Sequence, residues 1–325
     1  MIETHEASLA ASLQRAWDPE TAAVYADVLT SRGDPRGELI MIDLAEHTDA
    51  LLDRKRELIQ AWVGDEIAGW TWQPHDVGHG LLRGFAAATT GEHTMAGHLA
   101  TLFTAVGPHV SNLSLHGSSV ELSAAIDVIS DLGLPWLHAL SIHRSNTNTP
   151  IDKQVWERLI DATPNLRELS LIGHSIAVSP IHPAIDTLRL QGLAIAIGKQ
   201  PIASVTHLDF AFAANTDLTL PSVDQLAAMV NPRAFPVLRT LDLSRNLAPR
   251  AGAMGPRTAV LDVLGAIEQL ERFEHVRIPD VVDEATMAAL VVILVRCPGL
   301  VIELAKVYQP LESPHPRLII PSPRP

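Results

Sequence analysis

Histidines spaced for metal binding occur in the segment "HDVGHG", which begins at His75. His75 and His79 are four residues apart, and zinc sites on helices use histidines at i and i+4. His93 and His98 follow a little further along the chain. Pro74 and the two glycines of the segment disfavour a helix, so we interpret this segment as a surface loop rather than a metal site.

The single cysteine, Cys297 in "VRCPGL", is a candidate nucleophile of the kind that an effector-type ligase uses. The surrounding letters match "ATPNL" in an earlier segment, where Thr163 takes the place of the thiol. No His–Asp arrangement lies near Cys297 in the sequence, and a single cysteine cannot form an intramolecular disulfide. We therefore interpret it as a buried structural thiol.

A third candidate is "YADVLTSRGDPRGELIMID" at residues 25–43, which contains Arg-Gly-Asp. An adhesion role needs an extended extracellular loop, and a phosphate loop needs glycines after a strand and a Lys-Ser/Thr ending, which is missing here. The end of one helix and the start of the next explain the same residues. Gly33 suits the left-handed position after a helix, Asp34 suits an N-cap, and Pro35 suits the first position of the next helix.

This joint predicts a helix on each side. The helix before Gly33 should bury one apolar face, formed by Ala22, Val24, Tyr25, Val28 and Leu29. The second helix should run from Pro35 to about Val63, with Glu38 close to capping-box spacing.

A short repeat organises most of the chain. It reads "PHVSNLSL" at residues 108–115, "PWLHALSI" at 135–142, "PNLRELSL" at 164–171 and "PVLRTLDL" at 236–243. The same spacing without the proline occurs in "IDTLRL", "VTHLDF" and "FEHVRI", and "LRGFAA" at 82–87 is a weaker first copy. The central apolar residues of the copies are Phe85, Leu113, Leu140, Leu169, Leu188, Leu208, Leu241 and Val276.

The intervals between copies predict the remaining elements. Amphipathic helices fit the long intervals, at residues 120–132, 151–162 and 258–270. The two intervals of 19 and 20 residues beside Leu188 leave no room for a full helix and predict extended or turn structure.

The L-x-x-L-x-L spacing resembles the leucine-rich repeat family over roughly residues 80–304. In that family each repeat places a strand on a concave parallel sheet and a helix on the convex side. The resemblance therefore implies an α/β fold, a right-handed solenoid. The family's asparagine is matched only by Asn246, which favours the helix-containing, ribonuclease-inhibitor-like subtype. The equivalent positions of the other copies hold Ser118, Ser145, His174, Leu193 and Ala213.

The strand pattern also predicts which side chains project from the concave sheet. Between the paired apolar positions lie Ser114, Ser141, Ser170, Arg189, Asp209, Asp242 and Arg277. Two residues earlier on the same face lie Asn112, Ala139, Glu168, Thr187, His207, Thr240 and His275. Neighbouring strands should pair Arg189 with Asp209 and Asp242 with Arg277 as an ionic ladder.

We expect a partner-binding site on this face, formed by Arg189, His207, Asp209, Thr240, Asp242, His275 and Arg277. Two alternatives use some of the same residues. One is a metal held by His207, Asp209 and Asp242. The other is an enzyme or effector-type ligase using Cys297 or the group of His207, Asp209, Asp242 and His275. We expect neither, and so predict no catalytic residue, no metal and no cofactor.

Composition narrows the class of partner. The chain has 325 residues, 47% of them hydrophobic, so it can bury a large core. Its formal net charge is −13, and residues 1–110 hold 16 of the 37 acidic residues but 7 of the 24 Lys and Arg residues. This charge disfavours nucleic acid and anionic membrane as partners. The longest apolar run, residues 287–295, is too short to cross a bilayer, and the N-terminus has no signal-peptide pattern, so we expect a cytoplasmic location.

A second resemblance covers residues 7–45, where "YADVLTSRGDPRGELIMI" is similar to the repeat-companion domain that precedes repeat arrays in large-genome bacteria. Val28 stands where that family usually has tryptophan, and residues 41–43 depart from its common ending. The resemblance implies association with repeats and no activity of its own.

These observations predict three parts: a helical N-terminal domain at residues 1–66, a leucine-rich repeat solenoid at 67–307 and a Pro-rich tail at 308–325. The tail should form polyproline structure or be disordered, with a peptide ligand as the alternative. The predicted function is a non-catalytic scaffold that binds a protein through the concave face.

Overall fold

The computed structural model describes residues 2–46, 48–64, 77–89, 93–144, 153–178, 183–197, 200–212, 230–244, 259–278, 284–305 and 313–321. The chain divides into two units, which we call the first unit (Met1–Ser145 and Ile151–Arg167) and the second unit (Asn146–Pro150 and Glu168–Pro325). Within the described ranges, the helices are all too short or too polar to cross a membrane.

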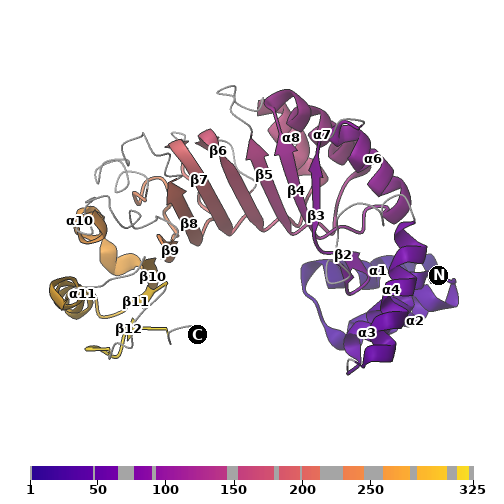
Figure 1. Cartoon of the computed structure of the whole chain (residues 1–325), viewed down its shortest axis with the longest axis horizontal. Helices are drawn as coiled ribbons and strands as arrows, with labels where there is room; N and C mark the ends of the chain where they lie inside the picture. The colour runs from indigo at the N-terminus through magenta and orange to yellow at the C-terminus, as the bar shows by residue number, and fades with distance from the viewer. Residues whose placement is uncertain are drawn as a thin grey trace. The chain divides into compact units, whose positions relative to one another are not determined.

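Four helices open the first unit: α1 (Ile2–Arg15), α2 (Pro19–Ser31), α3 (Pro35–Leu44) and α4 (Asp49–Val63), drawn in indigo and purple in Figure 1. The predicted joint between α2 and α3 is confirmed. Gly33 has φ 73°, and the Asp34 carboxylate accepts a hydrogen bond from the Arg36 backbone N–H at 3.0 Å. Pro35 occupies the first turn of α3.

The prediction of a single helix from Pro35 to about Val63 is wrong. The helix ends at Leu44, and α4 begins after Thr48, whose hydroxyl accepts a hydrogen bond from the Leu51 N–H at 3.3 Å. Threonine side chains compete for backbone groups in this way, so they favour helix starts over helix interiors. Glu38 does not complete a capping box; it accepts a hydrogen bond from Arg54 of α4 at 2.7 Å.

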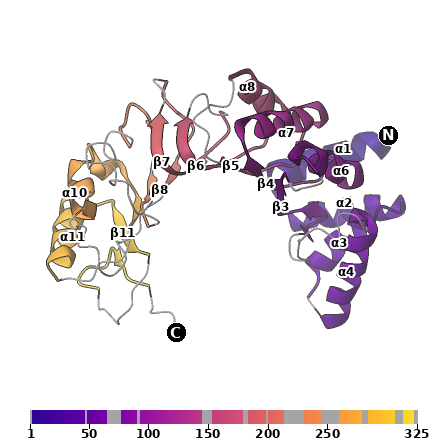
Figure 2. The ribbon, with the colours of Figure 1, turned by 45° about the horizontal axis from the view of Figure 1, so that its top comes forward.

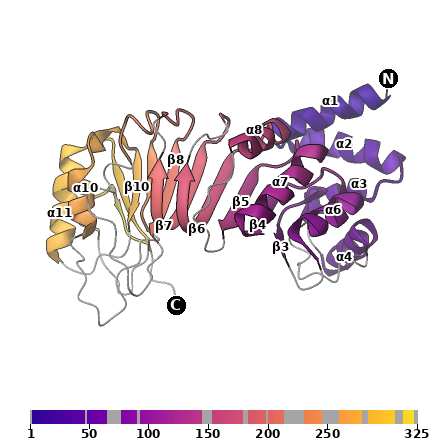
Figure 3. The ribbon, with the colours of Figure 1, turned by 90° about the horizontal axis from the view of Figure 1, so that it is seen from above.

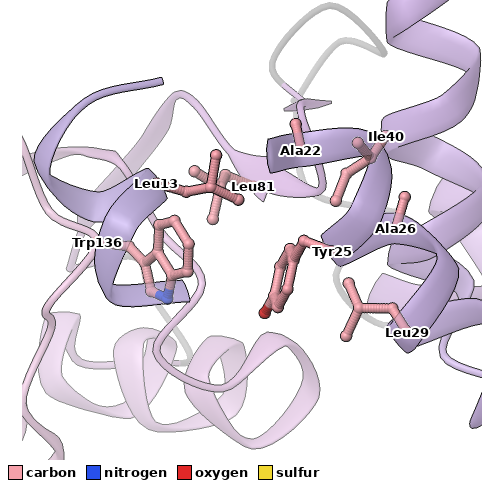
Figure 4. Close-up of a cluster of buried hydrophobic side chains, with 8 residues drawn as sticks. All are labelled: Leu13, Ala22, Tyr25, Ala26, Leu29, Ile40, Leu81 and Trp136. Carbon is pink, nitrogen blue, oxygen red and sulfur yellow. The ribbon is translucent and has the colours of Figure 1, made fainter. Parts of the chain in front are cut away.

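The first unit has a buried apolar cluster to which α1, α2 and α3 all contribute (Figure 4). Its members are Leu13, Ala22, Tyr25, Ala26, Leu29, Ile40, Leu81 and Trp136. Val24, predicted to lie on the buried face of α2, is 47% exposed, and Ala26 is buried instead. Trp136 belongs to the repeat copy at 135–142 and Leu81 to the segment just before the first copy, so the N-terminal helices share a core with this part of the unit.

Three parallel strands follow in the described part of the first unit: β3 (Phe85–Ala88), β4 (Asn112–Gly117) and β5 (Ala139–Arg144). A two-residue pair, β1 (Val77–Gly78) and β2 (Leu81–Leu82), precedes them as an antiparallel hairpin. Helices α6 (Met95–Val106), α7 (Ser119–Leu132) and α8 (Lys153–Ala162) cover one face of the three strands (Figure 2). The helices predicted at 120–132 and 151–162 are confirmed.

Sequence signals explain why α7 forms where it does. Ser118 and Glu121 form a capping box, with the Ser118 N–H donating to the Glu121 carboxylate at 2.7 Å. The helix ends at Gly133, where φ is 71°. Its inward face buries Leu122, Ile126 and other apolar side chains against the strands.

Seven parallel strands make up the sheet in the described part of the second unit. They are β6 (Glu168–Val178), β7 (Thr187–Ile197), β8 (His207–Phe212), β9 (Thr240–Asp242), β10 (His275–Ile278), β11 (Val301–Leu304) and β12 (Leu318–Ile319). The long strands β6 and β7 confirm extended structure in the two short intervals. Helix α10 (Ala259–Ala266), a 3₁₀ turn at Leu270–Arg272 and helix α11 (Glu284–Arg296) complete the described elements, and α10 and α11 lie side by side (Figure 3). The helix predicted to run to residue 270 is thus shorter than expected.

The central apolar residues of the repeat copies are aligned in a row within each unit. In the first unit, the register aligns Phe85 with Leu113 and Leu113 with Leu140. In the second unit, each neighbouring pair of strands aligns the corresponding residues in the series Leu169, Leu188, Leu208, Leu241 and Val276. All are at most 7% exposed, so the repeat spacing marks a continuous row of core side chains in each unit.

The C-terminal segment corrects an expectation. Residues 313–321 are neither polyproline nor disordered, because β12 pairs in parallel with β11 and Leu318 is 2% exposed. Arg317 anchors the strand by donating to the carbonyl oxygens of Cys297 at 2.6 Å and Leu300 at 2.9 Å. The flanking residues 308–312 and 322–325 lie outside the described ranges.

Candidate functional site

The exposed face of the second unit's sheet carries a row of charged side chains in register across neighbouring strands. In β10, Val276 and Ile278 are fully buried while the alternating residues are partly exposed, as expected for a sheet with one covered face. Strand pairing aligns five residues, one from each of five adjacent strands, that lie between the buried positions. We call them the charged row: Arg189, Asp209, Asp242, Arg277 and Glu303.

A second row lies two residues earlier in the strand register and runs across β6 to β10. We call it the flanking row: Glu168, Thr187, His207, Thr240 and His275. All seven residues predicted to bind a partner fall in these two rows, so the structure brings them together on one face. Adjacent strands lie about 4.8 Å apart, which places each side chain next to its register neighbour.

The two arginines of the charged row form the ion pairs that the sequence predicts. The Arg189 guanidinium lies 3.9 Å from the Asp209 carboxylate, and the Arg277 guanidinium lies 3.6 Å from Asp242. Each arginine also reaches a second carboxylate, Glu168 at 3.4 Å from Arg189 and Glu303 at 3.3 Å from Arg277. The predicted ionic ladder is therefore confirmed, with two further acidic members.

These ion pairs contribute little to the stability of the fold, so stability alone does not explain them. The arginine side chains are 46% and 39% exposed, and ion pairs at such positions typically contribute about 0–1 kcal/mol each. The pairing is also unbalanced, because the two rows hold four carboxylates (Glu168, Asp209, Asp242 and Glu303) against two guanidiniums. Asp209 and Asp242 are direct register neighbours. The face keeps a surplus of negative charge beside its ion pairs.

The histidines of the flanking row have hydrogen-bond partners close by. His207 Nδ1 lies 2.9 Å from the Thr206 hydroxyl, and His275 Nε2 lies 3.2 Å from the Glu303 carboxylate. In the part of the chain that the structure describes, no group of three or more His, Cys, Asp or Glu side chains is arranged to hold a metal ion.

Cys297 lies just after α11 and is 7% exposed. Burial raises the pKa of its thiol, with a smaller contribution from Glu271. A buried, protonated thiol is a poor nucleophile, since the thiolate is the reactive form. The geometry agrees with a structural thiol at the end of the helix.

The predicted binding site omits three members of the two rows: Glu168, Thr187 and Glu303. Glu303 follows from the register of β11, which aligns it with Arg277. The segment "PGLVIEL" at residues 298–304 lacks the spacing of the repeat copies, yet Glu303 still stands between Ile302 and Leu304, both fully buried. That apolar–x–apolar pattern is the sequence signal by which Glu303 could have been placed on the exposed face.

The first unit presents a different polar patch, which the sequence did not single out as a pair. The rings of His116 and His143, register neighbours on β4 and β5, are stacked at 3.9 Å. Each ring nitrogen Nε2 lies within hydrogen-bonding distance of a serine on its own strand, Ser114 at 2.9 Å and Ser141 at 3.0 Å. Burial lowers the pKa of both histidines, which favours neutral rings.

His79 and His98 both have contacts that contribute to the fold. His79 lies in the turn of the β1–β2 hairpin. Its ring is stacked at 3.8 Å on that of Trp17, and its backbone N–H donates to the Asp43 carboxylate at 2.6 Å. The ring of His98 contacts the Ala88 carbonyl oxygen at 2.8 Å. His75 lies outside the described residues, so the predicted surface loop stays a prediction there, whereas residues 77–80 belong to the hairpin.

Protein-family models and curated proteins were both compared with the chain, and neither comparison produced a match.

Proposed function

We propose that this chain is a non-catalytic scaffold that binds a protein partner through the charged row and the flanking row of the second unit. One observation carries the proposal: five charged side chains in register on adjacent strands, with more carboxylates than arginines. An open sheet face of this kind offers side chains spaced regularly along a broad surface, which suits a protein better than a small molecule. Its surplus negative charge favours a partner surface with Lys or Arg side chains.

We further propose that the fold is a leucine-rich repeat solenoid of the helix-containing type. The support is the combination of a fixed apolar spacing, parallel strands that align those positions, and helices between several strands. Solenoids of this type use an extended sheet surface for recognition. The proposal therefore assigns recognition to the sheet rather than to the helices.

For residues 7–45 we propose a capping role in the manner of a repeat-companion domain. Its motif residues have packing functions that account for their presence. Asp34 caps α3 and pairs with the largely buried Arg36, and a Cβ on Gly37 would lie 2.6 Å from the Ala26 carbonyl oxygen. The motif thus holds α2 against α3 and needs no ligand to explain it.

Site-specific photo-crosslinking tests the recognition surface and captures the partner in the same step. A photoreactive residue replaces Thr187, which lies in the flanking row but belongs to none of the four ion pairs of Arg189 and Arg277. The matched position is Glu271, an exposed residue of the 3₁₀ turn. We expect one protein to crosslink at Thr187 and not at Glu271. Capture at Glu271 alone would assign recognition to another surface.

A captured protein must then be shown to bind directly. The partner is purified, and its affinity for the full chain is measured by calorimetry at two salt concentrations. Because the proposed contact includes exposed charges, affinity should fall as salt rises. A captured protein that fails to bind in the purified pair would contradict the proposal.

A further inference from the structure

Helix α11 is apolar on two sides, although only one side faces the core. Its inward side buries Thr286, Leu290 and Leu294, spaced four residues apart. The opposite side exposes Ala285, Ala288, Val292 and Val295, of which the two valines are 51% and 67% exposed. We call these four residues the outer seam.

The outer seam has the spacing of a helix-pairing surface. Its members are separated by three, four and three residues, the a/d spacing of a coiled-coil seam. At about 100° per residue, they cover an arc of roughly 80° directly opposite Leu290. The seam runs along the helix as a narrow apolar strip.

The seam is also symmetric about Leu290. Ala285 and Val295 lie five residues to either side of it, and Ala288 and Val292 lie two residues to either side. The two exposed charged residues at the helix ends, Glu284 and Arg296, lie six residues to either side. Every position therefore has a counterpart of complementary size or opposite charge.

We propose that the outer seam pairs with the outer seam of a second copy of this chain, with the two α11 helices antiparallel about a two-fold axis beside Leu290. A two-fold axis at this point places Ala285 opposite Val295 of the other copy and Ala288 opposite Val292. Each small side chain then meets a larger one, which lets the helices approach closely. Glu284 of each copy meets Arg296 of the other, so the seam is flanked by two ion pairs.

Self-complementarity is what selects a second copy over an unrelated protein. A two-fold interface uses the same patch on both subunits, so the patch must be its own complement in shape and charge. A different partner would place no such requirement on residues to either side of Leu290. The opposite charges at the two ends of α11 also favour the antiparallel over the parallel pairing, in which like charges would meet.

The expected dimer is weak. A single pair of short helices lies below the roughly 1,200 Å² that marks stable interfaces, so dissociation in the micromolar range or above is expected. The proposal does not depend on how the charged row functions.

Disulfide trapping tests the predicted pairing directly. The double variant Ala285→Cys/Val295→Cys should form a covalent dimer with oxidised glutathione, because each new thiol faces its counterpart in the other copy. Within one helix the two positions are about 15 Å apart, too far for a disulfide. In each single variant, the new thiols of the two paired copies also lie about 15 Å apart, so neither single variant should crosslink. The unaltered chain, whose Cys297 is buried, controls for background oxidation.

Charge exchange supplies the second test, by sedimentation equilibrium of the full chain at high micromolar concentration. Glu284→Arg and Arg296→Glu should each weaken the dimer at least severalfold, whereas the double variant should restore it. Val292→Glu should give a monomer, whereas Val120→Glu, at an 81% exposed valine of α7, should not. A chain that stays monomeric, or a double cysteine variant that traps no more dimer than the single variants, would overturn the proposal.

Discussion

Gly33 shows how one residue defines the joint between α2 and α3. Its φ of 73° lies in the left-handed region, and a Cβ added there would find nothing within 4 Å. The requirement for glycine is therefore conformational and not a matter of space. This makes Gly33 a clean test of the joint.

Replacing Gly33 by valine should lower the free energy of unfolding by about 1–2 kcal/mol, since β-branched residues resist positive φ. Gly33→Asn should cost less, because asparagine adopts this conformation more readily. Urea denaturation of the three proteins measures the difference. Equal stabilities would mean that the chain does not require a left-handed residue at this position.

His109 links the stability of the first unit to pH. Burial, followed by the nearby Arg36 guanidinium, lowers the pKa of His109 to about 3 from its ordinary 6.5. Its ring lies 6.2 Å from that of Trp136, and among the described residues its Nδ1 has no hydrogen-bond partner. Between those two pH values the unfolded chain binds a proton that the folded chain excludes.

The stabilisation from a neutral His109 is therefore complete above pH 6.5 and is lost as pH falls toward 3. Linkage gives a loss of roughly 2 kcal/mol by about pH 5 from this residue. His109→Leu should remove that part of the pH dependence while keeping an apolar side chain. Urea denaturation across this range measures both proteins, and parallel curves would show that His109 titrates normally in the fold.

At the scale of elements, apolar periodicity predicted α7, whose capping box of Ser118 and Glu121 the structure adds. Asp34 with Pro35 predicted the start of α3. The break before α4 was missed because apolar periodicity continues through it, and only the Thr48 cap divides the run. Strand β12 was missed because the proline content of the tail suggested polyproline, whereas the side chain of Arg317 and the edge of β11 determine the structure of the strand.

Arg317 should be the anchor of the C-terminal strand. It donates to carbonyl oxygens at the end of α11 and after it, those of Leu294, Cys297 and Leu300. Arg317→Met keeps the apolar stem but leaves these acceptors unpaired, which should cost about 1–3 kcal/mol. Hydrogen exchange in Val301–Leu304 should accelerate.

Arg233→Met, at an exposed arginine of the same unit, is the matched control and should leave that exchange unchanged. Equal exchange rates in the two variants would show that β12 is held by its backbone bonds alone.

At the scale of the whole molecule, the resemblance to leucine-rich repeats implied parallel strands, and the repeat spacing predicted the direction of the side chains on the exposed face. Strand adjacency was enough to pair Arg189 with Asp209 and Asp242 with Arg277. The contribution of Glu168 was not predicted, because it depends on a long arginine reaching diagonally across strands. The same alignment places His116 beside His143, but the stacking of their rings depends on side-chain conformation, which the repeat spacing does not give.

The binding proposal predicts where interface energy lies. Interface energy concentrates in few residues, with arginine over-represented among them. Arg189→Ala, Asp209→Ala, Asp242→Ala and Arg277→Ala should each weaken partner binding by about 1 kcal/mol or more, a loss of at least roughly fivefold. Ser114→Ala and Ser141→Ala should not weaken it, because an isolated serine contributes little.

The most direct measurement is the affinity of the purified partner for Arg277→Ala compared with Arg239→Ala. Both arginines reach solvent and pair with carboxylates, but Arg239 lies before β9, outside the charged row, with Glu274 at 3.9 Å. Circular dichroism first establishes that each variant is folded. The proposed function predicts that Arg277→Ala weakens binding at least roughly fivefold while Arg239→Ala leaves it unchanged. Unchanged affinity for all four charged-row variants, with binding abolished instead by changes on the helices or in residues 1–66, would contradict it.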